Sequence, residues 1–233
     1  MRQIILDTET TGLDPAIGHR IIEIAGVELV NRRLTGNRFH RYVNPERDSE
    51  EGALQIHGLT SEFLADKPKF REIVEELLDY VTGAQLIIHN APFDIAFLNH
   101  ELNLIDLKPI TVYCPEIIDT LRMAKDFFPG KRNNLDALCE RFQVNNSART
   151  LHGALLDAEL LGEVYLAMTR GQESLIMEVD ESPATATAAN VARDPAAKLE
   201  ILVVHASDDE VAAHEAILAD LDKASGGKCL WKT

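Results

Sequence analysis

The chain has 233 residues, which is enough for one domain with a sizeable core and an appendage but cramped for two comparable domains. Its 45% of apolar and 26% of charged residues are ordinary for a globular protein and exclude wholesale disorder. The formal net charge of −15 argues against tight autonomous binding to duplex nucleic acid. It still permits chemistry at a strand end, if divalent cations or a basic partner neutralise the phosphates.

The N-terminus and the cysteines indicate a cytosolic protein without a disulfide framework. The apolar run 4–6 is far shorter than the core of a signal peptide, and no stretch approaches the ~18 apolar residues of a transmembrane helix. Cys114, Cys139 and Cys229 are odd in number and lack C-x-x-C spacing, so we expect small buried hydrophobic residues. A cytoplasmic location without membrane contact follows as an expectation.

Three strands, a helix and a fourth strand are predicted in the first part of the chain. Residues 3–9 form an apolar run that ends in acids, residues 21–30 are rich in β-branched side chains, and residues 39–43 alternate weakly. The apolar spacing over residues 70–81 predicts an amphipathic helix with a proline in its first turn. Residues 84–89 are typical of a buried strand.

The remaining elements of this part are predicted to be helices. Asn90 is a favourable N-cap for a helix over residues 93–102. Residues 117–125 and 135–142 are two further helical segments, separated by a stretch rich in turn-forming residues. The apolar spacing over residues 153–168 predicts a last long helix.

An abrupt change of composition after residue 170 divides the chain into three parts. Residues 1–170 are predicted to form an α/β domain with a mixed sheet flanked by helices. Small and polar side chains dominate much of residues 171–198, so this part is predicted to be a flexible linker. Residues 199–233 predict a short strand and a helix with a capping box at Ser207 and Glu210. So small a unit lacks a core of its own and is expected to bind a partner.

Acids and one histidine form the candidate chemical constellation. Asp7 and Glu9 lie two apart in a strand and project from one face, which is unfavourable without a cation between them; the alternative is a solvated strand end. Asp94 lies in the opening turn of an apolar helix, where it could serve only the helix dipole. His152 and Asp157 would lie about 140° apart around a helix axis, so we place His152 in the loop before the helix.

These residue types are the ones that two-metal phosphodiester hydrolysis requires. Two Mg²⁺ or Mn²⁺ ions ~3.5–4 Å apart stabilise the attacking and leaving oxygens of an in-line displacement at phosphorus, and they prefer hard carboxylate ligands. A histidine with an ordinary pKa of ~6.5 can take the proton from the attacking water near neutral pH. The residues therefore predict a site for two divalent ions with a histidine as general base.

Three motifs resemble those of the DnaQ-like DEDDh exonuclease family and occur in the family's order. They are Asp7-Thr8-Glu9-Thr10-Thr11-Gly12, His89-Asn90-Ala91-Pro92-Phe93-Asp94 and His152-Gly153-Ala154-Leu155-Leu156-Asp157-Ala158. The resemblance implies an RNase H-like fold and His152 as general base. It implies metal ligation by Asp7, Glu9, Asp94 and Asp157. It also implies contacts to the terminal nucleotide from Glu9, Thr10, Gly12, Leu13 and His57.

Positions beside these motifs leave alternatives open. His57 matches a family histidine near the substrate, but it can also be a capped loop histidine. Family members often have a glutamate where this chain has Gly52, and Glu51 could substitute for it through a shifted loop. Asp119 is better explained as a helix cap than as a fifth metal ligand.

The C-terminal part points to partners. Its sequence, which ends in residues 228–233, is similar to the segment by which bacterial proofreading subunits attach to the alpha (catalytic) subunit of the replicative polymerase. Residues 199–233 are therefore expected to bind that subunit, with Trp231 as the anchor unless it folds back onto the domain. Gln172 to Met177 resembles the short peptide that binds the sliding clamp, and a small accessory subunit is a further candidate partner.

Taken together, the resemblance implies a 3′→5′ exonuclease that acts on single-stranded DNA 3′ ends as a proofreading subunit. Two alternatives stay open. A nuclease of the same chemistry that acts alone, in RNA trimming or DNA repair, leaves the linker and the tail unexplained. A non-catalytic scaffold has no need to keep four acids and His152.

Overall fold

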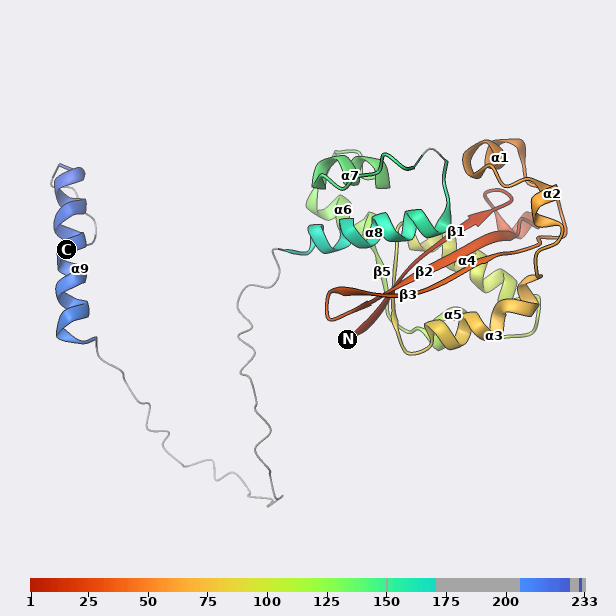
Figure 1. Cartoon of the computed structure of the whole chain (residues 1–233), viewed down its shortest axis with the longest axis horizontal. Coiled ribbons are helices and arrows are strands. Elements are labelled where there is room, and N and C mark those ends of the chain that lie inside the picture. Colours follow the sequence, from red (N-terminus) through yellow and green to blue (C-terminus); the bar gives the residue numbers. More distant parts are fainter. Residues whose placement is uncertain (150, 171–205, 227–230, 232–233) are drawn as a thin grey trace, which may run out of the picture. The chain divides into compact units, whose positions relative to one another are not determined.

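The computed structural model describes residues 1–149, 151–170, 206–226 and 231 (Figure 1). The chain divides into two compact units, Met1–Met177 and Glu178–Thr233. The predicted linker over 171–198, the short strand predicted at 199–204 and the clamp-binding peptide Gln172 to Met177 lie outside the described residues.

A five-stranded mixed sheet in the order β3-β2-β1-β4-β5 forms the centre of the first unit. β1 (Arg2–Thr10) pairs antiparallel with β2 (Ile21–Val30), which pairs antiparallel with β3 (Arg33–Tyr42). On the other side of β1, β4 (Gln85–Ile88) and β5 (Ile117–Asp119) are parallel to it. The predicted α/β fold is confirmed, and the carboxyl ends of three parallel strands share one edge of the sheet.

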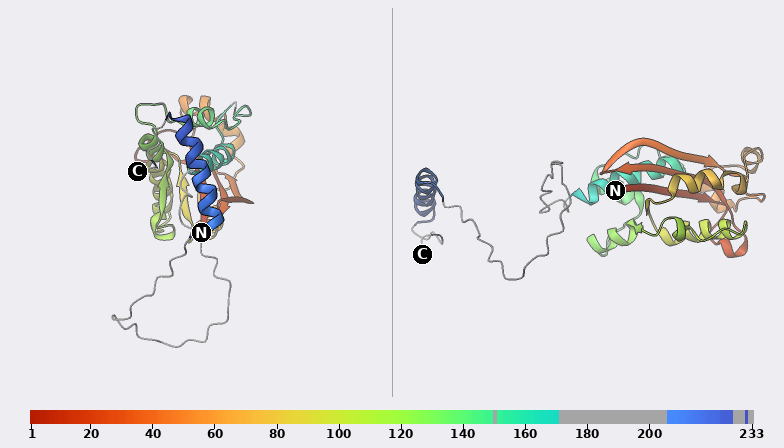
Figure 2. Two further views of the ribbon diagram at one scale, coloured as in Figure 1. Left: turned by 90° about the vertical axis from the view of Figure 1, so that its left-hand side faces the viewer. Right: turned by 90° about the horizontal axis from the view of Figure 1, so that it is seen from below.

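Helices cover both faces of the sheet (Figures 1 and 2). Those on one face are α3 (Phe70–Val81), α4 (Ala91–Asn103) and α5 (Ile110–Tyr113), and those on the other are α6 (Thr120–Phe127), α7 (Leu135–Phe142) and α8 (Ala154–Met168). Ile4 and Leu6 of β1 join the buried cluster of the first set, whereas Ile5 joins that of the second. Because successive strand side chains point to opposite faces, this central strand is apolar on both.

The helix predicted over residues 117–125 is wrong in its first three positions. Ile117–Asp119 form β5, because they pair with β4, and α6 follows directly. The Asp119 side chain accepts hydrogen bonds from the backbone N–H groups of Leu121 and Arg122 at 2.9 and 3.2 Å. Asp119 is therefore a helix cap, as the sequence indicates.

Other differences concern short elements and their ends. α1 (Glu51–His57), α2 (Ser61–Leu64) and α5 are too short to show a clear periodicity in the sequence. β3 begins at Arg33, six residues before the predicted strand, because it pairs along most of β2. The N-cap of α3 is Lys69, so the proline before it lies outside the first turn. Cys114 and Cys139 are free and buried, as predicted.

The described residues of the second unit are 206–226, which include the helix α9 (Asp208–Ala224), and Trp231. The hydroxyl of Ser207 accepts a hydrogen bond from Glu210 N at 3.4 Å, and Glu210 Oε2 accepts one from Ser207 N at 2.8 Å, so the predicted capping box is present. No residue of α9 is buried, and Trp231 is 80% exposed. Among the described residues, no helix combines the length and apolar character that crossing a membrane requires.

Candidate active site

A pocket of about 340 Å³ holds all five candidates for metal binding and proton transfer. Glu9, His152 and Asp157 each offer a ligand atom, and these three atoms lie within 4.8 Å of one another. Residues far apart in the chain thus converge into one site that can hold a cation. The lining residues are Asp7, Thr8, Glu9, His89, Phe93, Asp94, Asn134, Leu135, Asp136, Arg149, His152 and Asp157.

The Asp94 carboxylate ties α4 to the central strand. Its Oδ1 accepts hydrogen bonds from the backbone N–H and the hydroxyl of Thr8 at 3.1 and 2.7 Å. Asp94 therefore does more than favour the helix dipole. Asn90 before the helix differs from the prediction: it has a φ of 67° and makes no side-chain cap, and its backbone N–H donates to Asp119 Oδ1 at 3.2 Å. Asparagine tolerates this left-handed conformation better than most residues.

Arg149 is a residue of this site that the sequence analysis missed. Its Nε and Nη2 each donate to one oxygen of Asp157 at 2.6 Å, and its Nη1 donates to Asp136 Oδ1 at 2.8 Å. Only 6% of the Arg149 side chain is exposed. A buried two-point ion pair orients the Asp157 carboxylate. The one sequence signal for it is an arginine three residues before His152.

Burial and mutual repulsion raise the pKa of three acids in the pocket. The pKa of Glu9 rises to about 8, mainly through burial and then through the charges of Asp157 and Glu23. Burial also raises the pKa of Asp94, to about 7, and that of Asp7 well above its ordinary value. Clustered carboxylates that resist ionisation fit a divalent cation, which would supply the missing positive charge. The donors are carboxylate oxygens, which suit Mg²⁺ or Mn²⁺.

His152 lies in the loop before α8, and its side chain is 46% exposed. Its backbone N–H donates to Ile56 O at 3.0 Å, which links this loop to α1. Burial and then the charge of Arg149 lower the pKa of His152, so the ring is neutral at pH 7. Arg149 Nη2 lies 3.1 Å from Nδ1. Because arginine can only donate, Nδ1 is the acceptor and Nε2 carries the proton.

Glu23 of β2 is a second residue that the sequence analysis missed, because nothing local distinguishes it from an ordinary strand acid. Its side chain is buried, with Oε1 2.7 Å from His40 Nε2. Its Oε2 accepts a hydrogen bond from Ala154 N at 3.2 Å. Glu23 thus holds the first turn of α8, the helix that carries Asp157. It also lies directly opposite Glu9 in the β1–β2 pairing.

A neighbouring pocket of about 310 Å³ is lined by all five residues expected to contact the terminal nucleotide. Leu13 and Ile56 are 80% and 49% exposed there, and Phe93 contributes to both pockets. Exposed apolar side chains beside a polar pocket suit the face of a nucleobase. The expected residues that line it are Glu9, Thr10, Gly12, Leu13 and His57.

A buried histidine positions the loop of this second pocket. The ring of His19 lies so close to Gly12 that a Cβ there would overlap it. His19 Nδ1 is 3.1 Å from Thr11 Oγ1, and its Nε2 is 3.0 Å from Glu50 Oε1. The pair His19–Glu50 therefore joins the motif loop to the start of α1.

The two acids before Gly52, Glu50 and Glu51, differ in whether they line this pocket. Glu50 lines the pocket together with Gly52, whereas Glu51 does not. The carboxylate of Glu51 instead accepts a hydrogen bond from Gln55 Nε2 at 3.4 Å. Of these two acids, Glu50 therefore lines the pocket beside Gly52, where family members often have a glutamate, and Glu51 does not.

His57 is the last residue of α1 and is 4% exposed. Its Nδ1 accepts a hydrogen bond from Leu59 N at 2.9 Å, which agrees with the alternative of a capped histidine. Its Nε2 has no hydrogen-bond partner among the described residues. Burial lowers the pKa of His57, so a neutral ring borders the pocket.

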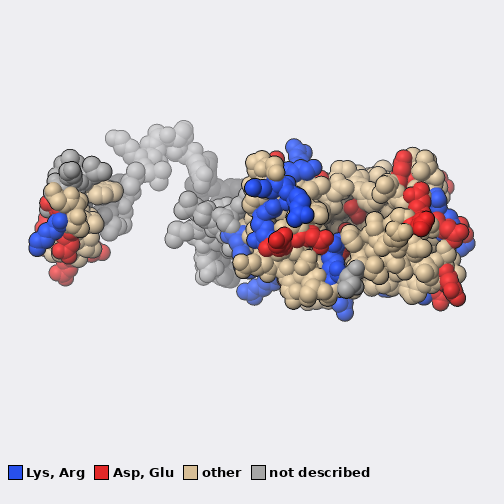
Figure 3. All heavy atoms as spheres, turned by 90° about the horizontal axis from the view of Figure 1, so that it is seen from above, with Lys and Arg blue, Asp and Glu red and all other residues tan. Residues whose placement is uncertain are grey.

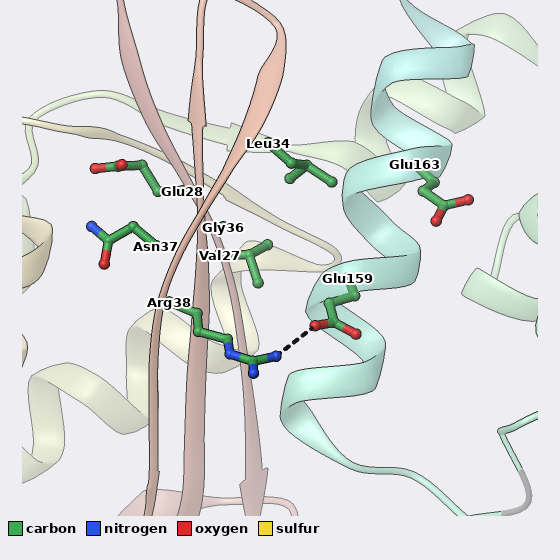
Figure 4. Close-up of a pocket in the computed structure, with 8 residues that line it drawn as sticks. All are labelled: Val27, Glu28, Leu34, Gly36, Asn37, Arg38, Glu159 and Glu163. Carbon is green, nitrogen blue, oxygen red and sulfur yellow. Dashed lines mark hydrogen bonds and ion pairs between the residues drawn. The ribbon is translucent and has the colours of Figure 1, made fainter.

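A further cavity of about 200 Å³ lies between the β2–β3 hairpin and α8 (Figure 4). Arg38 Nη1 and Glu159 Oε1 form an ion pair of 3.4 Å across it. None of the residues singled out by the sequence lines this cavity. It is therefore separate from the two pockets that the candidate residues line.

Comparison with known proteins identifies relatives over most of the chain. Residues 4–165 match the family described as Exonuclease, RNase_T. DNA polymerase III subunit epsilon of Escherichia coli (strain K12) is 51% identical over 241 residues, which cover 99% of this chain and 97% of that protein. The subunit of the same name from Rickettsia felis is 49% identical over 226 residues, with 97% and 99% covered.

Solved structures share the fold of the first unit. Exonuclease X in complex with 5′ overhanging duplex DNA superposes with a TM-score of 0.56 at 26% identity, over 72% of this chain and 92% of that one. The nuclease domain of 3′hExo, a DEDDh family member bound to rAMP, gives 0.63 at 21% identity over 73% and 92%. The predicted RNase H-like exonuclease fold is confirmed.

Proposed function

This chain belongs to the exonuclease family and is related along nearly its whole length to DNA polymerase III epsilon subunits, and from this premise we propose its reaction and partners. It hydrolyses the terminal phosphodiester of single-stranded DNA 3′ ends in the bacterial cytoplasm. It does so as the proofreading subunit of the replicative DNA polymerase III. The observation that carries the proposal is the convergence of four carboxylates and His152 on one pocket.

Each acid of the pocket has a role in this proposal. Asp7, Glu9, Asp94 and Asp157 hold two Mg²⁺ or Mn²⁺ ions, because they are the hard oxygen donors of the pocket and three of them resist ionisation without a cation. Bound there, such ions supply Lewis acidity at the scissile phosphate and lower the pKa of the attacking water.

His152 is the general base of the proposed reaction. Its lowered pKa keeps the ring neutral at physiological pH, as a proton acceptor requires. Nε2 already carries a proton while Arg149 donates to Nδ1. The bond from Arg149 must therefore break before Nδ1 can accept a proton, and the partly exposed side chain of His152 has room to move.

The neighbouring pocket holds the terminal nucleotide. Leu13 and Ile56 contact the base, Thr10 lies at the end of β1, and Gly12 lies in the following loop against the His19 ring. His57 also lines this pocket, and its buried Nε2 has no hydrogen-bond partner among the described residues. These assignments explain why both pockets share Glu9, since a scissile phosphate lies next to its own nucleoside.

Partners bind through the C-terminal part. Residues 199–233 bind the alpha subunit of DNA polymerase III, with Trp231 as an exposed aromatic anchor. Gln172 to Met177 bind the sliding clamp, and a small accessory subunit is a third candidate. A tether between nuclease and polymerase keeps the nuclease at high effective concentration near the primer end.

A primer with a 3′ mismatch tests the reaction. The full chain with Mg²⁺ or Mn²⁺ should release nucleoside 5′-monophosphates from the 3′ end, and a chelator should stop their release. The same assay on an RNA strand of equal sequence tests the alternative of RNA trimming. Faster hydrolysis of RNA than of DNA, or no metal-dependent release from either, would contradict the proposal.

A truncated chain tests the partners. Residues 1–177 contain both buried clusters and should keep hydrolysis within about twofold. The truncated chain should no longer co-purify with the polymerase. Unchanged co-purification would place the interface on the first unit instead.

A further inference from the structure

Basic side chains gather at the end of the first unit that α6, α7 and their connecting loop form (Figure 3). The four exposed members are Arg122, Lys125, Lys131 and Arg132, which together are termed the α6–α7 basic patch. Residues 122–132 contain these four cations and one acid, Asp126, for a formal charge of +3. The whole chain has a formal net charge of −15, so this segment is positively charged in a strongly acidic protein.

The patch differs from most other basic residues of the domain in having no internal partners. Arg20 pairs with Glu101 at 2.6 Å, and Arg149 pairs with Asp136 at 2.8 Å. None of the four patch side chains forms an ion pair or a hydrogen bond with another described residue. Their charges are therefore available to an anion from outside the domain.

Side-chain contacts fix the backbone of the loop that carries Lys131 and Arg132. Arg141 of α7 donates to Arg132 O at 2.8 Å and to Asn133 Oδ1 at 3.0 Å. Its guanidinium also lies over the ring of Phe128, 4.4 Å from the centroid. Asn133 Nδ2 closes the loop by donating to Phe128 O at 3.2 Å. The buried groups of the loop hold its backbone while its two cations point into solvent.

The patch borders the catalytic pocket. Asn134, Leu135 and Asp136 line that pocket, and Arg132 precedes Asn134 by two residues, a span of at most ~7 Å. On the same side, His89 lines the pocket and has a pKa lowered mainly by burial, with smaller contributions from Arg149 and Lys125. The positive charge of Lys125 therefore reaches the rim of the site.

We propose that the α6–α7 basic patch binds the phosphodiester backbone of the strand whose 3′ end occupies the catalytic pocket, a few nucleotides upstream of the scissile bond. The proposal rests on the proposed function and deepens it. The two rims of the site differ in kind: Leu13 and Ile56 on one side suit a base, whereas unpaired cations on the other suit phosphates. A local positive surface also explains how so acidic a chain retains a polyanion.

The number of phosphate contacts can be measured from the salt dependence of DNA binding. Each phosphate neutralised on a single strand contributes about 0.7 to the slope of log affinity against log salt. The affinity lost with one such contact is therefore about fivefold greater at 0.1 M salt than at 1 M salt. The substitutions Lys131→Gln and Arg132→Gln together should reduce the slope by about 1.4 and the affinity at 0.1 M salt by about 25-fold.

The experiment compares two substrates of the full chain. The p-nitrophenyl ester of thymidine 5′-monophosphate fills the pocket but has no upstream phosphate, whereas a dT12 oligonucleotide has several. The variant K131Q/R132Q should hydrolyse the ester like the wild type, while its kcat/KM on dT12 falls about 25-fold at 0.1 M salt. The matched control is R33Q/K108Q, which removes two exposed cations that line neither pocket and should change neither rate.

The outcomes separate this proposal from the proposed function. Unchanged dT12 hydrolysis with an unchanged salt slope overturns the role of the patch. Equal losses on both substrates also overturn it, because they mean that the pocket itself is disturbed. If the wild type cleaves neither substrate, the proposed function fails, and fluorescence anisotropy of labelled dT12 decides the patch. Weaker binding by K131Q/R132Q than by R33Q/K108Q then supports it, and equal binding overturns it.

Discussion

The two described units differ in what they bury. In the first unit, two apolar clusters cover both faces of β1, and the acids of the site extend from these clusters into the pocket. In the second, α9 has a good N-cap but buries none of its residues, and Val211, Ile217 and Leu221 stay exposed. A helix with local capping and no packing gains its stability from whatever it docks on. The first unit therefore holds the candidate site, and the second holds the segment of the proposed attachment.

The largest expected effect tests whether the chemistry belongs wholly to the first unit. Asp7→Asn should lower kcat about a thousandfold, because the loss of one ligand removes roughly 4 kcal/mol of transition-state stabilisation. It should also raise the melting temperature in chelator, since the pKa of Asp7 shows that burial disfavours its ionised form. Single-turnover hydrolysis and calorimetry measure the two effects.

The control for this change is Asp79→Asn, an exposed acid of α3 outside both pockets. It should leave hydrolysis within about twofold and melting unchanged. A kcat for Asp7→Asn within tenfold of wild type would move the metal site elsewhere.

The second effect tests the attachment. Trp231→Ala should weaken binding to the polymerase by about 2 kcal/mol, or roughly thirtyfold, because exposed aromatic anchors dominate interface energies. Hydrolysis by the isolated chain should not change. Surface plasmon resonance with the polymerase measures the affinity, and Asp220→Asn on α9 is the matched control. Equal affinities for Trp231→Ala and wild type would remove the tryptophan from the interface.

A pH series sharpens the comparison, because the acids with raised pKa values lie in the first unit. Glu9 has an ordinary pKa of 4.5 and one of about 8 in the folded chain. Between these two pKa values the folded state keeps a proton that the unfolded state has lost. The contribution of Glu9 to the free energy of unfolding is therefore fully present below about pH 4.5 and is lost as the pH rises towards 8. In chelator, the melting temperature should drop between pH 5.5 and 8.5 by 2–4 °C for each kcal/mol lost, as a rough guide.

Two comparisons check the cause of that drop. Mn²⁺ should abolish it, because the bound cation favours the ionised acids. Glu9→Gln should show a shallower dependence than wild type in chelator. A melting temperature that rises with pH in chelator would contradict the raised pKa of the pocket acids.

The smallest effect concerns Arg149 and His152. The guanidinium lowers the pKa of His152 after the larger effect of burial, so Arg149→Met should raise that pKa. Arg149→Lys retains the charge and should leave it lower than in the Met variant. NMR titration of the imidazole in metal-free protein measures the pKa of His152 directly. The acid limb of the pH–rate profile should also move to higher pH in Arg149→Met. An unchanged pKa in Arg149→Met would show that the guanidinium has no influence on the ring.

Much of the fold could be predicted because its signals are local. The strand and helix repeats of residues 3–9, 21–30 and 70–81, and the Ser207–Glu210 capping box, each depend on side chains a few positions apart. β5 could not be predicted in this way. Its three residues became a strand only because they lie along β4, more than twenty residues earlier in the chain.

The sequence by itself determined the kinds of residue at the site, because motif acids and a histidine keep their chemistry wherever the chain places them. Only the tertiary structure decided what surrounds them. Arg149 meets Asp157 and Asp136 through loop geometry, and Glu23 reaches the first turn of α8 across 131 positions. Such contacts follow no repeat along the sequence. An acid or arginine that makes one cannot be told from an ordinary surface acid or arginine by its neighbours in the chain. The raised pKa values of the pocket have the same origin, because burial and repulsion between distant acids exist only once the chain has folded.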